Sequence, residues 1–277
     1  MLGALEFAQK QKAETIYLSD REPAGLTPSH FVKYCGEGYV GLTIAHAIMH
    51  YIGINQVAKI RQETIDRCGQ TFGDFSSLVS VAFPESEFFD TTTLQTIADL
   101  FNTALSGGAR IFSFGNGGSG AYSSYFCSEL RRIMFGDASS SRIIDLNSNW
   151  GAIARAMMDG TYKERAFLDQ LLGYGVTEAD ALLGASTSGS SRNITLPFEN
   201  LPCTRKVAIV GYPGGALKDM ATHCWVTPNV GHIIGHAAEF ALKETLQIAA
   251  LSFMLNYLAY IRAEAKKEVD LALSLDG

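Results

Sequence analysis

The chain has 277 residues and a net charge of −6, with 47% apolar and 18% charged residues. This composition predicts a folded globular protein and excludes a disordered or low-complexity chain. Binding of nucleic acid needs a basic face, and the nearest approach to one is the single pair Arg131-Arg132, so we expect no nucleic-acid partner.

Cysteine usage and the apolar segments bear on the compartment. The five cysteines are scattered, odd in number and without a Cys-x-x-Cys pair, which argues against a disulfide framework and fits a reducing compartment. Residues 1–9 lack the basic region and apolar run of a signal peptide. Residues 248–261 are the most apolar stretch, too short to span a bilayer. We therefore expect a cytoplasmic protein without a membrane segment.

The chain is expected to have two parts. Residues 1–60 predict a helical N-terminal extension, interrupted by a loop at Pro23, Gly25 and Pro28, and residues 61–277 predict the main domain.

The main domain begins with helices. A helix is predicted over residues 94–105, with Thr91 or Thr92 as its N-cap and residues 106–108 as its end.

From residue 109 onward, short apolar runs alternate with helical patterns. Strands are predicted at residues 109–114, 142–146, 181–185, 206–211 and 224–227. Helices are predicted at residues 120–135, 149–158, 163–172, 216–221 and 236–267. This alternation predicts an α/β fold, a three-layer doubly wound sandwich whose five-stranded parallel sheet has helices on both faces. Ligands of such sheets bind on the loops at the carboxyl ends of the strands.

The first predicted strand ends in a run of small residues, Gly115–Ser119. Glycines let backbone N–H groups approach an anion closely, and the start of the following helix adds unpaired donors and a favourable dipole. The Ser119 hydroxyl can donate as well. The alternative is a tight strand–helix turn that binds nothing.

The third predicted strand ends in a similar cluster, residues 186–191, where five hydroxyl side chains surround Gly189. Hydroxyls and backbone donors can bind a phosphate without a lysine, and such a neutral site suits a small phosphate ester in an acidic protein. The alternative is a serine-rich surface turn.

Residues 114–119 and 183–191 closely resemble the two signature loops of the sugar isomerase (SIS) domain, and in particular its phosphoheptose isomerase branch. The resemblance covers about residues 90–262. It implies a phosphorylated sugar as ligand, no cofactor, and a homodimer or homotetramer whose sites lie between subunits. The residues that it implies for sugar-phosphate binding are Asn116, Gly117, Ser119, Asp159, Ser186, Thr187, Ser188 and Ser191.

An aldose–ketose isomerase moves a proton between C1 and C2, which needs a carboxylate or histidine base and an acid partner. The resemblance places Glu129 at the position of the family's glutamate, and the alternative is a solvated glutamate on a helix. The family's last helix carries a Gln and a His. Alignment on Pro228 puts Ala237 or Ala238 at the first position and Thr245 or Leu246 at the second.

Histidines elsewhere can replace the missing partner. His232 and His236 are four residues apart at the start of the last helix and can share one face, although ordinary structural histidines are an equal alternative. Some relatives bind zinc through a histidine whose position holds Tyr125 here. We predict no metal site, because Glu129 alone cannot hold zinc.

Three functions follow from these residues. The first is an isomerase of a phosphorylated sugar such as sedoheptulose 7-phosphate, using Glu129 with His232 or His236. The second is a non-catalytic SIS module that binds a sugar phosphate or a protein, as a bacterial relative binds the replication initiator; the missing Gln and His favour it. The third is an isomerase or lyase for another phosphosugar, with a rebuilt acid–base pair.

Overall fold

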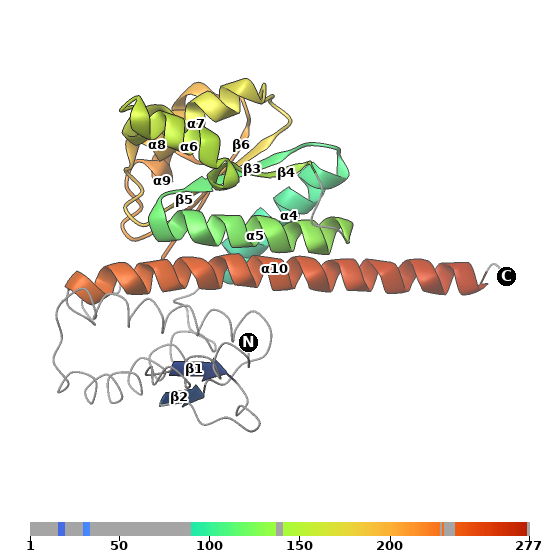
Figure 1. The fold of residues 1–277 in the computed structure, drawn as a ribbon. Helices are drawn as coiled ribbons and strands as arrows, with labels where there is room; N and C mark the ends of the chain where they lie inside the picture. Colours follow the sequence, from blue (N-terminus) through green and yellow to red (C-terminus); the bar gives the residue numbers. More distant parts are fainter. Residues whose placement is uncertain are drawn as a thin grey trace, which may run out of the picture. The chain divides into compact units, whose positions relative to one another are not determined.

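The computed structural model is drawn in Figure 1. It describes residues 16–19, 30–33, 90–136, 141–227, 229 and 236–275. Of these, the side chains of residues 16–19, 30–33, 91, 236–242, 256 and 268–275 lie outside the description. The chain divides into two compact units, Met1–Gly73 and Asp74–Gly277.

The first unit contains two short strands that the sequence analysis did not anticipate. β1 (Ile16–Ser19) pairs in parallel with β2 (His30–Lys33), with Ile16 opposite His30. Most of residues 1–60 lies outside the described residues, so the helical extension and its boundary at residue 60 stay predictions.

The second unit is built on a five-stranded parallel sheet in the order β4-β3-β5-β6-β7. Its strands are β3 (Ile111–Gly115), β4 (Ile143–Asp145), β5 (Ala181–Ser186), β6 (Arg205–Val210) and β7 (His223–Val226). Every residue of β3 and β5 is buried, as expected for central strands with both faces covered.

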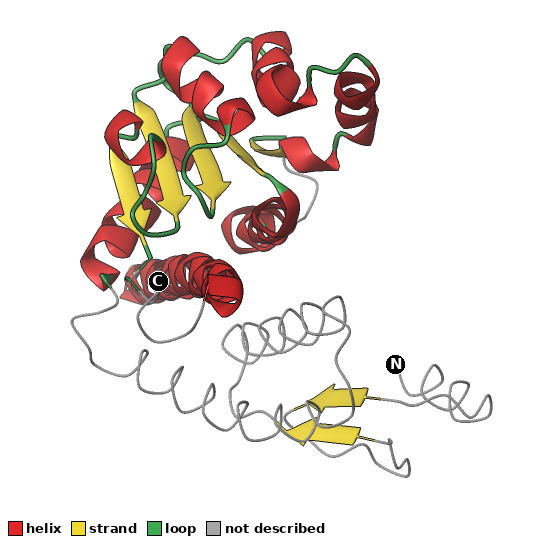
Figure 2. Ribbon diagram, turned by 90° about the vertical axis from the view of Figure 1, so that its left-hand side faces the viewer, coloured by secondary structure: helices red, strands yellow, loops and turns green. Residues whose placement is uncertain are grey.

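Helices form one layer on each side of this sheet (Figure 2). The first layer contains α4 (Thr91–Ser106), α5 (Gly117–Phe135) and α10 (His236–Leu275). The second contains α6 (Trp150–Met158), α7 (Tyr162–Gly173), α8 (Arg192–Asn200) and α9 (Leu217–Met220). A short 3-10 turn, Leu146–Ser148, joins β4 to α6. The predicted three-layer α/β sandwich is confirmed.

The alternation of side chains along β3 shows how the layers are held. The Phe114 ring lies 5.3 Å from that of Phe167 on α7 and 6.2 Å from that of Phe198 on α8. Ser113 points to the opposite face, where its hydroxyl lies 2.5 Å from that of Ser123 on α5. Successive side chains of a strand alternate between its faces, so β3 contributes to both cores.

The start of α4 differs from the prediction. Thr91 and Thr92 lie inside the helix, and Asp90 is the N-cap, because its carboxylate accepts a hydrogen bond of 2.9 Å from the backbone N–H of Thr93. The predicted end is confirmed, since Gly107 is the C-cap.

The last helix, α10, begins where predicted and continues to Leu275, beyond the predicted end at residue 267. Among the helices that the structure describes, none combines the length and the apolar character that crossing a membrane requires.

The amino-terminal edge of the sheet is held by an ion pair whose carboxylate is buried. Asp180, which precedes β5, is 3% exposed, and its carboxylate accepts a hydrogen bond of 2.7 Å from Nη2 of Arg110, which precedes β3. The backbone N–H groups of Arg110 and Thr177 donate to the same carboxylate at 3.0 and 2.9 Å. Burial by itself would raise the pKa of Asp180, but these hydrogen bonds lower it to about 2.

We expect Asp180→Asn to lower the free energy of unfolding at neutral pH by about 2 kcal/mol, because it removes a charge that the folded state stabilises. The pKa of Asp180 is lower in the folded chain than its ordinary value of 3.8, so this stabilisation is present above about pH 4. It disappears as the pH falls through about 2. Urea denaturation at several pH values measures the difference.

The control for this prediction is Asp169→Asn, which removes an exposed ion pair between Asp169 and Arg165 on α7. Exposed pairs contribute little, so its free energy of unfolding should stay close to that of the wild type. Equal effects of the two substitutions would contradict the role assigned to Asp180.

Candidate functional site

The two loops singled out in the sequence meet at the carboxyl edge of the sheet. They follow β3 and β5, which are neighbours, with Gly115 in register with Ala185. Ser119 and Thr187 are 3% and 8% exposed, and their hydroxyl oxygens lie 3.4 Å apart. The structure therefore brings one predicted hydroxyl from each loop together.

The first loop has room for glycine alone at its start. A Cβ atom added to Gly115 would lie 2.9 Å from both the carbonyl oxygen of Ala185 and the backbone nitrogen of Gly120. Asn147 holds the same residue on both sides: its Oδ1 accepts from the Gly115 N–H at 3.1 Å, and its Nδ2 donates to the Gly115 carbonyl at 2.7 Å. These contacts fix the loop against its neighbouring strands.

Asn116, the next residue, links the first loop to the other helix layer. Its amide and that of Asn193 on α8 exchange two hydrogen bonds, each 2.9 Å long. The Tyr162 hydroxyl donates to Asn116 Oδ1 at 3.2 Å. The Asn116 side chain, predicted to bind substrate, is thus also part of the framework that positions the loop.

The second loop folds back on itself and rests on a third turn. Ser186 Oγ accepts from the backbone N–H of Gly189 at 3.1 Å. Gly189 has a φ of 64°, and a Cβ there would lie 1.9 Å from the carbonyl oxygen of Gly214. The Leu217 N–H donates to the Gly189 carbonyl at 2.9 Å. The Pro-Gly-Gly turn after β6 therefore supports the loop directly.

Two helices begin at these loops. Asn116 is the N-cap of α5 and Ser191 that of α8, and neither side chain forms a capping hydrogen bond. Helix N-termini carry partial positive charge and free N–H groups, so two of them at one edge form a site that suits an anion. Ser188 and Ser190 are exposed at the second loop, where their hydroxyls are accessible.

The last helix completes the site with residues that the sequence analysis missed. Gln247 is 1% exposed; its Oε1 accepts from the Ser119 hydroxyl at 3.2 Å, and its Nε2 donates to the Ile209 carbonyl at 3.0 Å. Glu244, 3% exposed, lies one turn earlier against the first loop. The sequence contained a signal for these two residues. Glu244 and Gln247 are polar side chains three residues apart within an otherwise apolar helix.

The structure describes the three predicted proton-transfer residues to different extents. Glu129 is half-buried on α5, where Arg132 Nη2 donates to its Oε2 at 2.8 Å. Ten residues separate it from Ser119, which is about 15 Å along the helix axis. His232 lies outside the described residues, and His236 begins α10 with its side chain outside them.

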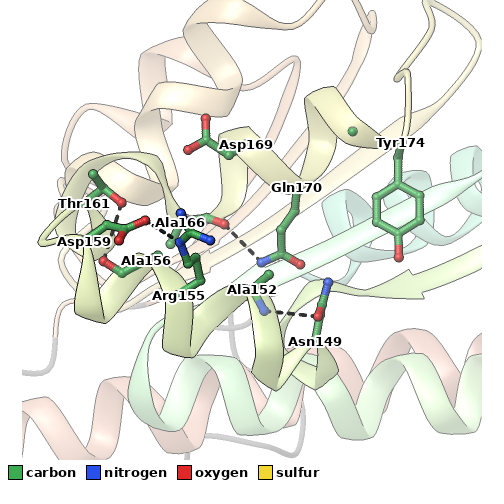
Figure 3. Close-up of a pocket in the computed structure, with 11 residues that line it drawn as sticks. Asn149, Ala152, Arg155, Ala156, Asp159, Thr161, Ala166, Asp169, Gln170 and Tyr174 are labelled. Carbon is green, nitrogen blue, oxygen red and sulfur yellow. Dashed lines mark hydrogen bonds and ion pairs between the residues drawn. The ribbon is translucent and has the colours of Figure 1, made fainter.

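Asp159 is the C-cap of α6. Its Oδ2 accepts from Nε of Arg155 at 2.7 Å, and it lines a cavity of about 410 Å³ between α6 and α7. Figure 3 shows this cavity, with Gln170 and Tyr174 on the side opposite Asp159. No residue of the two loops is among those that line it.

Groups of three or more potential metal ligands are absent from the described part of the chain. Burial raises the pKa of Cys127 to about 12 and those of Cys203 and Cys224 to about 11, which favours the protonated thiols at neutral pH. The described residues of the site carry hydroxyl, amide and carboxylate groups.

Comparison with known proteins finds relatives among the phosphoheptose isomerases. The chain is 31% identical over 160 residues to the phosphoheptose isomerase of Akkermansia muciniphila, covering 53% of this chain and 84% of that protein. It is 31% identical over 180 residues to that of Thermodesulfovibrio yellowstonii, covering 60% and 89%. No protein-family model matches the chain.

A solved structure is similar in fold. The phosphoheptose isomerase of Neisseria gonorrhoeae superposes with a TM-score of 0.53 at 22% identity, covering 68% of this chain and 97% of that one.

We expect Gly189→Ala to be far more destabilising than Gly160→Ala. Both glycines have a left-handed φ, 64° and 69°, so both substitutions cost about 1–2 kcal/mol in backbone strain. The added methyl group at residue 189 also meets the Gly214 carbonyl, whereas at residue 160 it meets nothing within 4 Å. Urea denaturation compares the two, and equal losses would contradict the packing described for the second loop.

Proposed function

The chain belongs to the phosphoheptose isomerase family, and we propose that it is a sugar-phosphate isomerase whose two loops hold the phosphate group of its substrate. The observation that carries this proposal is the approach of Ser119 and Thr187 to 3.4 Å at the start of α5 and beside the loop that leads into α8. Two helix N-termini and converging hydroxyls suit a phosphate ester.

Phosphate binding is assigned to both loops. Hydroxyl groups and backbone N–H groups supply the hydrogen bonds. The phosphate is therefore bound by uncharged donors, which suits a chain with few basic residues. The proposed contacts are Asn116, Gly117, Ser119, Ser186, Thr187, Ser188 and Ser191. Asp159 stays the proposed contact to sugar hydroxyls.

The relatives are named for isomerisation of a heptose phosphate, and we propose sedoheptulose 7-phosphate as the substrate here. The reaction moves a proton between C1 and C2 and needs no external oxidant or reductant. Glu129 is the proposed proton-transfer residue from the resemblance, with His232 or His236 as its partner. We also propose a cytoplasmic homodimer or homotetramer without a cofactor.

We expect the purified chain to convert sedoheptulose 7-phosphate into its aldose isomers, and Ser119→Ala combined with Thr187→Val to raise KM about 100-fold or more. Each lost hydrogen bond to a charged group removes about 1.5–3 kcal/mol of binding. A panel of sugar phosphates, assayed by chromatography, measures both effects. Ser128→Ala, an exposed serine on α5, is the matched control. A wild type that is inactive on every sugar phosphate would contradict the proposed function.

Glu129→Gln tests the residue carried over from the family. It keeps the shape of the side chain and removes its charge, so kcat should fall about 100-fold if the carboxylate transfers the proton. Glu164→Gln, on the exposed surface of α7, should have no effect. Activity of Glu129→Gln at the wild-type level would remove Glu129 from the mechanism.

A further inference from the structure

The cavity between α6 and α7 has a lining of its own. Asn149 and Asp159, which cap the two ends of α6, line it together with Thr161 and Tyr174, which cap the two ends of α7. The two helices therefore run antiparallel along the cavity, as in an αα-hairpin. Its volume of about 410 Å³ is in the range of small-molecule sites, and no residue of the two phosphate loops lines it (Figure 3).

Gln170 on α7 brings an unused hydrogen-bond acceptor to this cavity. The residue is 8% exposed, and its Nε2 donates to the Ala166 carbonyl at 3.0 Å. Its Oε1 is buried, and no group in the described part of the chain donates to it. Buried acceptors without a donor are costly and rare in folded proteins. Gln170 therefore favours a ligand that offers an O–H or N–H group.

The charges on the cavity wall are matched by partners. Asp159 is paired with Arg155 at 2.7 Å, and Asp169 is paired with Arg165 at 2.6 Å. Both carboxylates that line the cavity thus have a guanidinium beside them. The wall has no excess of positive charge to attract a phosphate and no excess of negative charge to attract an amine. An uncharged ligand is therefore favoured.

An amide donor and an aromatic ring lie on the same wall. Asn149 Oδ1 accepts from the backbone N–H of Ala152 at 3.3 Å, so its Nδ2 group is left to donate to a ligand. The Tyr174 ring is held 5.5 Å from the Phe112 ring, yet the residue is 43% exposed. Exposed aromatic rings pack against the C–H groups of sugars, whereas amides bind their hydroxyls.

A chain of hydroxyl groups supplies what this wall lacks. Each hydroxyl donates once and can also accept, so one can donate to Gln170 Oε1 while another accepts from Asn149 Nδ2. The small side chains of Ala152, Ala156 and Ala166 line the cavity as well and leave room for the carbon chain.

We propose that the cavity between α6 and α7 binds an uncharged polyhydroxyl compound, a sugar or sugar alcohol without a phosphate group, through Gln170, Asn149 and Tyr174. This inference goes beyond the proposed function, because the ligand and these residues differ from those assigned to the phosphate loops. It makes no use of Asp159, which lies on the opposite side of the cavity from Gln170 and Tyr174 (Figure 3).

The test measures binding of three sugar alcohols, D-mannitol, D-glucitol and ribitol, by saturation-transfer NMR on the full chain. These compounds have no carbonyl group, so an isomerase cannot turn them over. We expect at least one of them to bind saturably to the wild type. Gln170→Met keeps the length of the side chain and removes the acceptor, so the dissociation constant should rise about 10-fold with the loss of one hydrogen bond.

Ala152→Phe is a second variant, which fills the cavity and leaves every polar group in place. It should abolish saturable binding of the same sugar alcohol. Ala154→Phe is the matched control, because Ala154 is exposed on the same helix and does not line the cavity. It should bind as the wild type does. Ala152→Phe decides the matter if Gln170→Met does not fold, and the reverse also holds.

Three results would overturn this inference. One is the absence of saturable binding of all three sugar alcohols, which would leave the cavity to water. Another is wild-type affinity in Ala152→Phe or in Gln170→Met. The third is displacement of the sugar alcohol by sedoheptulose 7-phosphate, because that would place both compounds in one site. The proposed function is judged separately, by turnover of sugar phosphates, so either proposal can fail without the other.

Discussion

Close approach of backbones at the carboxyl edge of the sheet is the constraint on which the site depends. Three turns meet there, after β3, β5 and β6, at distances that exclude any side chain. A Cβ at Gly115 would lie 2.9 Å from the Ala185 carbonyl, and one at Gly215 would lie 2.4 Å from that of Ser188. Glycine is the residue that permits such contacts. The turns therefore hold one another, and neither phosphate loop has an independent conformation.

This packing arranges the chemistry of the site. It directs the start of α5 and the loop leading into α8 towards one place, with Ser119 and Thr187 between them. It also leaves the space over Gly118 that the Glu244 carboxylate fills. The same edge thus has neutral hydroxyl donors at Ser119 and Thr187 and a buried carboxylate packed against Gly118. Burial strengthens both kinds of interaction, since the local dielectric constant is low.

The opposite edge of the same sheet serves stability. Asp180 joins the residues before β5 and β3 through Arg110 and Thr177, in a cluster where each carboxylate oxygen accepts more than one hydrogen bond. Because the cluster fixes the register of β3 against β5 where the two strands begin, it also helps to align the two loops that follow these strands. Stability and ligand binding are separated by the length of a strand, as is usual for parallel sheets.

The sequence by itself determined the local elements of the main sheet: five short strands, the helices between them and the glycine-rich turns, because apolar periodicity and glycine act over a few residues. The likeness of the two loops to a known family predicted a phosphate site there. Only the tertiary structure decided that β3 lies between β4 and β5, and that Glu244 and Gln247 reach the first loop. Gln247 is 128 residues from Ser119, and contacts across such a separation depend on how whole helices pack, which no short pattern encodes.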